Sequence, residues 1–222
     1  MRLTTLLRFA VFLCLSFFAG KATANHEIVF ILAGQSNMAG QGERAKLPAR
    51  YRRNPPNVSF YYNGYKTPLN HFVHIGPEIG FAHEVSRRFP SHHIKLIKFA
   101  VGGTSMLAWA PHWSAARANI TQNASAGPLF KKLLQTANAS YDKSMSHVSA
   151  VLWMQGEADA KYPAVARSYE NNLRNFIVSL RRQLDNRITQ FVVAGVNPPL
   201  KQFPAVATVQ SAQRQVVSSR KR

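Results

Sequence analysis

The sequence predicts an α/β fold with a mainly parallel sheet that is covered by helices on both faces. Short apolar runs rich in β-branched residues alternate along the chain with longer amphipathic stretches. Strands that are separated by helices pair in parallel through right-handed crossovers. No internal repeat and no linker rich in proline, glycine or serine divides the chain. Its 222 residues are enough to bury one hydrophobic core, so we expect a single mature domain.

Residues 1–24 are interpreted as a cleaved secretory signal peptide. Two arginines precede an apolar stretch at residues 9–18, and Ala22-Thr23-Ala24 supplies the small residues of a signal-peptidase site. A transmembrane anchor is the alternative, but this stretch is too short to cross a bilayer unaided. The only cysteine, Cys14, lies in the same segment, which leaves the mature chain without a disulfide or a cysteine-based metal site. We therefore expect a domain over residues 25–222 that is secreted or periplasmic and has no stable membrane span.

The first half of the mature chain contains two predicted strands and one predicted helix. Residues 28–33 form a continuous apolar run, which is typical of a strand buried on both faces of a parallel sheet. Residues 41–74 are rich in proline, asparagine, tyrosine and arginine, and we expect there a long loop or a small excursion beside the end of the first strand. Residues 77–89 begin with a proline that suits the first turn of a helix. Residues 93–101 are the second predicted strand.

The second half continues the alternation. A helix is predicted at residues 128–139, again with a proline at its start, and an apolar strand follows at 148–154. Residues 164–184 have the periodicity of one long amphipathic helix with an arginine-rich outer face. A fourth strand is predicted at 188–196 and a last helix at 205–217. This order of elements favours a layered sheet with helices on both sides.

The first predicted strand ends in a sequence that is typical of a nucleophile turn. Gly34 allows the chain to leave the strand sharply, and Ser36 follows among small and polar residues. A serine at the carboxyl end of a parallel strand lies where open α/β sheets bind their ligands. If the chain continues as a helix, the free N–H groups of that helix favour the negative charge that develops during acyl transfer. Ser36 is therefore the predicted nucleophile.

Two further strand ends carry polar groups to the same edge of the predicted sheet. The second strand is followed by Gly102-Gly103-Thr104-Ser105, where the glycines let backbone N–H groups approach a ligand. A glutamine and two acidic residues follow the third strand. Because parallel strands end at one rim, the sequence predicts an acyl-transfer site at that rim. In this site the Gly103 N–H and the side-chain amide of Gln155 stabilise the oxyanion formed by attack of Ser36.

Four neighbouring residues have two interpretations each. Glu157 is a candidate supporting acid, which either orients a base or holds the glutamine loop in shape. Asp159 is a candidate substrate contact for sugar hydroxyls, or it caps the following helix. Trp109 and Trp113 follow the Gly-Gly turn, and they either offer a face for stacking against a sugar or pack under the loop.

The charge balance favours an anionic environment. The chain has 28 lysines and arginines against 9 acidic residues, which gives a formal net charge of +19 at pH 7. These basic residues are scattered, and no helix-turn-helix, finger or RNP pattern is present, so nucleic acid is not the expected partner. For an exported protein, an anionic polysaccharide or an anionic envelope surface is the expected counterpart. The alternative is a solvated basic face with no specific partner.

Four sequence segments together resemble a known superfamily. They are GQSNMAG at residues 34–40, GPEIGFA at 76–82, VGGTS at 101–105 and WMQGEAD at 153–159. Their order and content are similar to the successive blocks of the SGNH/GDSL hydrolases, and most similar to the carbohydrate-esterase branch, which includes sialate O-acetylesterase-like domains and acetylxylan esterases. Because these segments span nearly the whole mature chain, the resemblance is far more specific than a single motif.

The resemblance implies a fold and a reaction. It implies a flavodoxin-like three-layer α/β/α sandwich of the SGNH type. It also implies hydrolysis of acetyl esters on sugars with no metal and no other cofactor, and with the serine, a glycine N–H and the glutamine side chain forming the oxyanion hole. The nucleophile elbow of the α/β-hydrolases is a poorer match, because Met38 stands where that motif requires glycine.

One block of the superfamily has no counterpart in this sequence. The general base of the family is a histidine in an Asp-x-x-His block that follows a fifth strand near the C-terminus, and this sequence stops at Arg222 with neither. The resemblance therefore predicts a chain truncated before its last strand and helix. His71, His74 and His112 lie in predicted loops near the rim, but none has the spacing of the family.

The expected function follows from these observations. It is serine-dependent hydrolysis of O-acetyl esters on an acetylated carbohydrate, such as sialate or a xylan-like polysaccharide. A serine hydroxyl is a weak nucleophile without an adjacent base. The alternative is therefore a catalytically impaired remnant of such an esterase that still binds polysaccharide.

Overall fold

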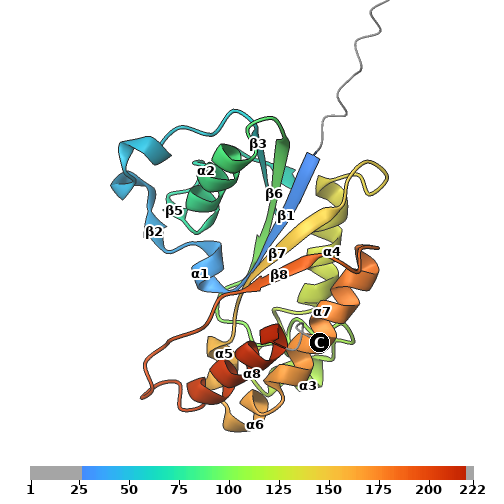
Figure 1. Ribbon diagram of the computed structural model, residues 1–222. Helices are drawn as coiled ribbons and strands as arrows, with labels where there is room; N and C mark the ends of the chain where they lie inside the picture. The colour runs from blue at the N-terminus through green and yellow to red at the C-terminus, as the bar shows by residue number, and fades with distance from the viewer. Residues whose placement is uncertain (1–26, 219–222) are drawn as a thin grey trace, which may run out of the picture.

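In the residues that the structure describes, 27–218, a six-stranded sheet lies between two layers of helices (Figure 1). The structure is a computed structural model. The strands of this sheet are β1 (Glu27–Gly34), β3 (Val58–Tyr62), β4 (Tyr65–Lys66), β6 (His93–Ala100), β7 (Val148–Met154) and β8 (Gln190–Val193). Their spatial order is β4-β3-β6-β1-β7-β8, and every neighbouring pair is parallel except the β3–β4 hairpin. The predicted α/β class with a mainly parallel sheet is confirmed.

The helices form the outer layers. In Figure 1, α2 (Glu78–Arg88) covers one face of the sheet, and α4 (Leu129–Ser140), α7 (Tyr169–Gln183) and α8 (Val206–Ser218) cover the other. The remaining elements are short. They are α1 (Ser36–Ala39), the paired strands β2 (Gly42–Glu43) and β5 (His74–Ile75), the 3-10 turns η1 (Arg44–Lys46) and η2 (Ala49–Tyr51), α3 (Ala115–Asn119), α5 (Glu157–Ala160) and α6 (Pro163–Ala166).

The continuous apolar run of β1 supplies both halves of the core. Successive side chains of a strand point to opposite faces of the sheet. Val29 and Ile31 accordingly join the cluster beneath α4, α7 and α8, while Phe30 and Leu32 join the cluster beneath α2. All four side chains are buried. A strand buried on both faces cannot alternate apolar with polar residues, which explains its pattern.

Most predicted elements are present at nearly the predicted positions, and two differ in extent. The strand expected at 188–196 ends at Val193, after which the chain leaves the sheet at Ala194. The helix expected at 164–184 is interrupted, with α6 ending at Ala166 and α7 beginning at Tyr169. The buried side chains of both helices keep helical spacing across this interruption, so the sequence pattern alone does not reveal it.

The expectation of a long loop or small excursion over residues 41–74 missed two strands of the six-stranded sheet. This segment contains β3, which pairs in parallel with β6, and the antiparallel strand β4. A signal was available, because Asn63-Gly64 stands between tyrosine-rich runs, and Asn-Gly between strand-forming residues is a strong hairpin indicator. Phe60 of β3 is buried beneath α2, so this strand contributes a side chain to the hydrophobic core.

Three predictions concern the ends of the chain or a membrane. The proposed signal peptide, with its cleavage site, lies outside the described residues. Among residues 27–218, β8 forms one edge of the sheet, and the further strand that the family resemblance implies has no counterpart there. No helix in this part of the chain is long and apolar enough to cross a membrane.

Candidate active site

The turn after β1 brings Ser36 to the carboxyl edge of the sheet. Gly34 has a φ of 150°, and a Cβ atom at this position would lie 2.0 Å from the carbonyl oxygen of Met154 on the neighbouring strand. Only glycine fits there. The Gln35 N–H then donates to the same carbonyl oxygen at 2.9 Å, and Ser36 begins the one-turn helix α1.

The ends of β1, β6 and β7 meet at one pocket, as the sequence predicts for parallel strands. Its volume is about 440 Å³, which lies in the range of small-molecule sites. Ser36 and Gly103 both line it. The neighbouring Gly102 lies against the nucleophile turn, since a Cβ atom there would be 3.4 Å from the Ser36 Cβ. The structure therefore brings together two of the residues predicted for acyl transfer.

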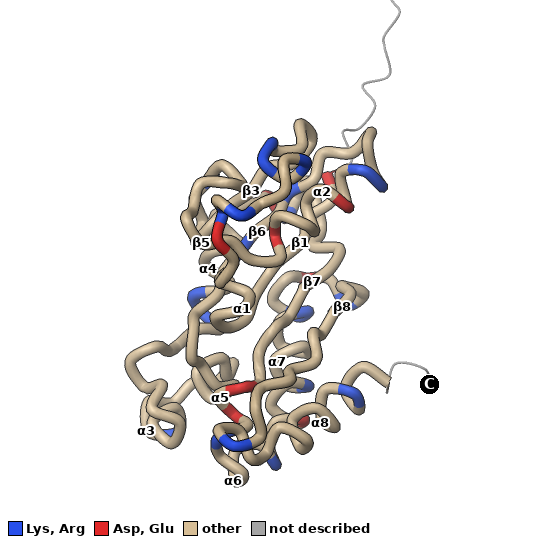
Figure 2. The backbone as a smooth tube through the Cα atoms, turned by 90° about the vertical axis from the view of Figure 1, so that its left-hand side faces the viewer, with Lys and Arg blue, Asp and Glu red and all other residues tan. Residues whose placement is uncertain are grey.

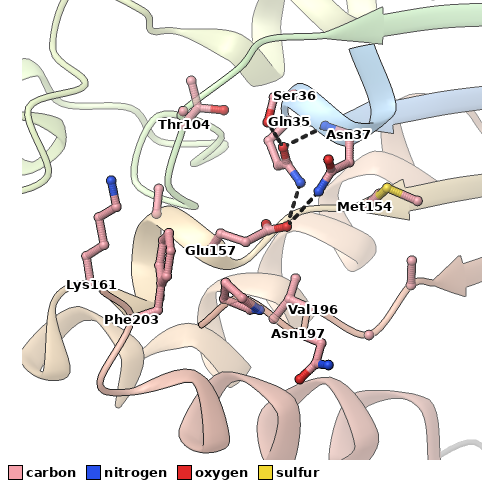
Figure 3. Close-up of a pocket in the computed structure, with 15 residues that line it drawn as sticks. Gln35, Ser36, Asn37, Thr104, Met154, Glu157, Lys161, Val196, Asn197 and Phe203 are labelled. Atoms are coloured by element: carbon pink, nitrogen blue, oxygen red, sulfur yellow. Dashed lines mark hydrogen bonds between the residues drawn. The ribbon is translucent and has the colours of Figure 1, made fainter. Parts of the chain in front are cut away.

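The hydroxyl of Ser36 takes part in a short polar chain (Figure 3). Ser36 Oγ donates to Gln35 Oε1 at 2.5 Å, and Gln35 Nε2 donates to Glu157 Oε1 at 2.7 Å. The hydroxyl, amide and carboxylate follow one another as the three groups of a catalytic triad do, but the central group here is a carboxamide. An amide oxygen accepts a hydrogen bond but is far too weak a base to remove the hydroxyl proton at neutral pH. Gln35 therefore orients Ser36 and does not act as its general base.

Glu157 holds the two amide side chains that flank Ser36. Its Oε1 accepts from Gln35 Nε2 and, at 3.2 Å, from Asn37 Nδ2, while its Oε2 is buried without a partner in the described residues. Burial raises the pKa of the Glu157 carboxyl above its ordinary value, and the hydrogen bond from Asn37 partly opposes this. These contacts give Glu157 a structural role, but the segment that its side chain binds is the nucleophile turn and not the glutamine loop that the sequence-based interpretation named.

Two residues that line the pocket, Ser36 and Gly103, have backbone N–H groups without a protein acceptor among the described residues. Gly103 has a φ of 69°, and the space beside its Cα is open. Its carbonyl group is held from behind by Asn123, whose Nδ2 donates to Gly103 O at 3.2 Å and whose Oδ1 accepts from Ser105 N–H at 2.8 Å. Sequence reasoning missed this role of Asn123. The residue opens an Asn-Ala-Ser sequon, and nothing in the sequence shows that its side chain contacts the Gly-Gly turn.

The prediction that Gln155 donates to the oxyanion is contradicted. Its side chain is fully buried and does not line the pocket. Both hydrogens of its amide are already used, since Nε2 donates to Thr104 O at 2.8 Å and to Asp159 Oδ2 at 2.6 Å. Gln155 thus ties the end of β7 to the loop that follows β6.

Asp159 is neither a sugar contact nor a helix cap, so both interpretations are wrong. It is fully buried, and its two oxygens accept from the Met106 N–H at 3.1 and 3.0 Å. Burial raises the pKa of the Asp159 carboxyl to about 7, although the hydrogen bonds from Gln155 and Met106 oppose this shift. The residue anchors the loop that carries Gly103.

The predicted stacking platform is also wrong. Trp109 is fully buried in the core, edge-on to Trp153. Trp113 packs on Gly127, where a Cβ atom would lie 2.0 Å from its Nε1. Neither tryptophan lines the pocket. The aromatic residue that does so is Phe203, and the ammonium of Lys161 lies 5.3 Å from the centroid of its ring (Figure 3).

The wall opposite Ser36 is formed by residues 194–198, which α8 holds in place. Val196 is bound through both of its backbone groups. Its N–H donates to Gln213 Oε1 at 3.2 Å, and its carbonyl oxygen accepts from Gln210 Nε2 at 2.7 Å. Gln213 Nε2 also donates to Gln155 O at 3.0 Å, which links α8 to the turn after β7. The sequence pattern did not single out these glutamines as site residues, because nothing in it shows which loop a helix will face.

No histidine in the described part of the chain lines the pocket. His71 and His112 are exposed, and His74 lies exposed on the small strand β5. His83 is on α2, and His92, His93 and His147 lie at the amino ends of β6 and β7, opposite the pocket. Within residues 27–218, no three or more His, Cys, Asp or Glu side chains are grouped closely enough to hold a metal ion.

Comparison with known proteins identifies the family. The model of the family described as "Carbohydrate esterase, sialic acid-specific acetylesterase" matches residues 26–221. The chain belongs to this carbohydrate esterase family. The resemblance to SGNH carbohydrate esterases is thereby confirmed. The turns after β1, β6 and β7, which carry Ser36, Gly103 and Gln155, all lie within the matched region.

The relatives of this carbohydrate esterase chain agree with the assignment. It is 28% identical over 181 residues to a probable carbohydrate esterase of Arabidopsis thaliana, a match that covers 71% of this chain but only 64% of that protein. A crystal structure of an Arabidopsis thaliana protein has a TM-score of 0.70 at 22% identity and covers 86% of this chain and 82% of its own. A carbohydrate acetylesterase from Xanthomonas citri has a TM-score of 0.63 at 17% identity, with coverages of 86% and 47%. These structures share the three-layer fold.

Proposed function

We propose that this chain hydrolyses O-acetyl esters on carbohydrates, with Ser36 as the nucleophile. The observation that carries the proposal is the position of the Ser36 hydroxyl in the pocket, beside the free N–H groups of Ser36 and Gly103. Membership of a carbohydrate esterase family supports the same reaction.

The proposed reaction has two steps. Ser36 Oγ attacks the acetyl carbonyl carbon, and the carbonyl oxygen becomes an oxyanion that accepts from the two N–H groups. Collapse of this intermediate breaks the bond to the sugar oxygen, which takes a proton and leaves as the free hydroxyl. Water then attacks the acetyl-serine, which releases acetate and restores Ser36.

The proton that leaves Ser36 requires an acceptor. Gln35 Oε1 is not basic enough to take it, and Glu157 is joined to Ser36 only through Gln35. Because no histidine of residues 27–218 lines the pocket, we expect slow turnover by the purified chain. If that turnover is absent altogether, the alternative function is binding of polysaccharide in the same pocket.

Lys161 favours an acidic sugar as the substrate. It is the only lysine or arginine among the residues that line the pocket, and its side chain is exposed beside Phe203. The negative charge of Glu157 faces the amides of Gln35 and Asn37, so it leaves the ammonium available for a substrate carboxylate. We therefore expect acetylated sialate to be a better substrate than neutral acetylated xylan.

The basic surface supports an anionic partner. The loop that follows α1 carries Arg44, Lys46, Arg50, Arg52 and Arg53, all of them exposed. In Figure 2, basic segments lie beside β5 and above α1. We propose that an anionic polysaccharide, or an anionic surface of the cell envelope, binds there, and that the protein is secreted or periplasmic.

Chemical rescue with imidazole tests the proposed reaction. Residues 25–222 should hydrolyse an aryl acetate slowly, and added imidazole should raise the rate by up to about a hundredfold as it takes the serine proton. Ser36→Ala should abolish this gain, whereas Ser91→Ala, at an exposed serine remote from the pocket, should retain it. The same assay with acetylated sialic acid and acetylated xylan compares the two substrate classes. An equal response to imidazole in Ser36→Ala would remove Ser36 from the mechanism.

A further inference from the structure

A buried ion pair lies beneath the nucleophile turn. Lys98 projects from β6 and Glu78 from the first residue of α2, and each side chain is only 1% exposed. Lys98 Nζ lies 2.6 Å from Glu78 Oε2. The proposed reaction gives no role to this pair.

The pair is connected to the helix that carries Ser36. Lys98 Nζ also donates to the carbonyl oxygen of Ala39, the last residue of α1, at 2.8 Å. Glu78 Oε1 accepts from the Gly76 N–H at 2.8 Å. Gly76 in turn lies against α1, since a Cβ atom there would be 2.9 Å from the carbonyl oxygen of Met38. The two charges therefore fasten the end of α1 and the chain before α2 to β6.

A helix of one turn needs such external contacts. The last carbonyl groups of a helix have no partner within it, and a single turn is not stable by itself because nucleation costs more than one hydrogen bond returns. In α1 the side chain of Gln35 binds the Asn37 N–H at the amino end. At the carboxyl end, Lys98 is the side chain that binds the Ala39 carbonyl.

Burial of two charges is unfavourable unless their hydrogen bonds are well formed. Removal from water lowers the pKa of Lys98, while the carboxylate of Glu78 opposes that shift. Apolar residues of similar volume would fill this space at less electrostatic cost, but they would leave the Ala39 carbonyl and the Gly76 N–H without partners. The contacts to α1 distinguish this pair from one that only fills the core.

We propose that Lys98 and Glu78 are positioning residues, which fix α1 so that the Ser36 hydroxyl and the Ser36 N–H stay aligned with the Gly103 N–H. The proposal rests on the proposed esterase function. It predicts that loss of the pair lowers the rate of the chemical step more than it changes substrate binding.

The experiment compares two double variants, each of which removes an ion pair made by a lysine of β6. Lys98→Met/Glu78→Met removes the pair without leaving a lone buried charge. Lys95→Met/Glu27→Met is the control, because Lys95 Nζ lies 3.0 Å from Glu27 Oε2 at the other end of β6, away from the pocket. Both variants are assayed for Ser36-dependent aryl acetate hydrolysis in imidazole, for melting temperature, and for hydrogen exchange of the amides of residues 36–40.

The variant at Lys98 and Glu78 should lose about tenfold to a hundredfold in kcat with KM nearly unchanged. Its amides at 36–40 should exchange faster than in the control variant at equal melting temperature. Equal kcat and equal exchange in the two variants would show that the pair only fills the core, and would overturn the proposal. If the parent shows no Ser36-dependent hydrolysis, the proposed function fails, and exchange at residues 36–40 still decides whether the pair positions α1.

Discussion

Gln155 and Ser36 each follow a strand of the same sheet, but their side chains have different surroundings. Ser36 leaves β1 through Gly34 and lines the pocket. Gln155 follows β7 directly, and its carbonyl oxygen accepts from Tyr169 Oη at 2.7 Å while its side chain reaches Thr104 and Asp159. At the scale of single residues, the two strand ends thus have separate tasks. The first brings the hydroxyl of Ser36, the proposed nucleophile, to the pocket, and the second fixes the loop that carries Gly103.

Asp159 makes this loop sensitive to pH. The pKa of its carboxyl is about 7 in the folded protein against an ordinary value of 3.8, so the folded state binds the proton more strongly than the unfolded state does. Its contribution to stability is fully present below about pH 4 and is lost as the pH rises toward 7. Relative to Asp159→Asn, the free energy of unfolding of the parent should fall by up to about 1.4 kcal/mol per pH unit in this window.

Urea denaturation from pH 4 to pH 8 measures this difference. Asp142→Asn is the control, because hydrogen bonds from Ser144 lower the pKa of the exposed Asp142 carboxyl, and its contribution is lost as the pH falls rather than as it rises. Parallel stability curves for the parent and Asp159→Asn would show that Asp159 stays ionised in the folded protein throughout.

At the scale of elements, α8 connects the outer helix layer to the pocket. Its buried Gln213 binds the Val196 N–H and the Gln155 carbonyl oxygen, and Gln210 binds the Val196 carbonyl oxygen. The segment after β8 has left the sheet, so these side chains replace the ladder hydrogen bonds that a longer strand would have made. The helix therefore shapes the pocket wall that faces Ser36.

Gln213→Leu should open this wall. It removes the acceptor of the buried Val196 N–H, which should reduce the free energy of unfolding by about 1–3 kcal/mol. Loss of the wall should also weaken binding of an acetylated sugar more than it slows hydrolysis of a small aryl acetate. Gln215→Leu, at an exposed position of the same helix, is the control for denaturation and binding measurements. An unchanged stability and affinity in Gln213→Leu would show that the wall holds without α8.

For the molecule as a whole, the surplus of positive charge is the basis for the proposed anionic partner. The net charge of +19 attracts anionic polymers at low ionic strength and is screened as salt is added. The segment of residues 44–53, which carries the exposed basic residues, follows α1 closely in the sequence.

Binding to an acidic polysaccharide tests this arrangement. The parent should bind polygalacturonate at low salt and lose most of this affinity by about 0.5 M salt, because the Debye length then falls below the spacing of surface charges. Arg50→Gln/Arg53→Gln should bind more weakly than Lys131→Gln/Lys132→Gln, which removes the same charge from α4. Equal loss in the two variants would indicate a general charge effect without a defined surface, and equal binding of a neutral xylan would contradict an electrostatic partner.

The sequence by itself determined the class of the fold, the four strands β1, β6, β7 and β8 in their order along the chain, and the position of Ser36 at a strand end. Apolar runs and turn residues are local signals, and parallel strands must end at one rim, so Ser36 and Gly103 could be placed together without a structure. The same reasoning missed β3, although the Asn63-Gly64 turn beside it was a local signal.

Only the tertiary structure decided which way the polar and aromatic side chains face beyond the strand ends. Gln155, Asp159 and Trp109 come after strands, as Ser36 does, but their side chains are buried. Gln155 binds Thr104, and Asp159 binds Met106. Trp109 packs in the hydrophobic core. The same holds for the contacts of Lys98 with Ala39 and of Gln213 with Val196. The direction of a side chain after a strand depends on the turn and on what packs against it, and neither is encoded in the local pattern of the sequence.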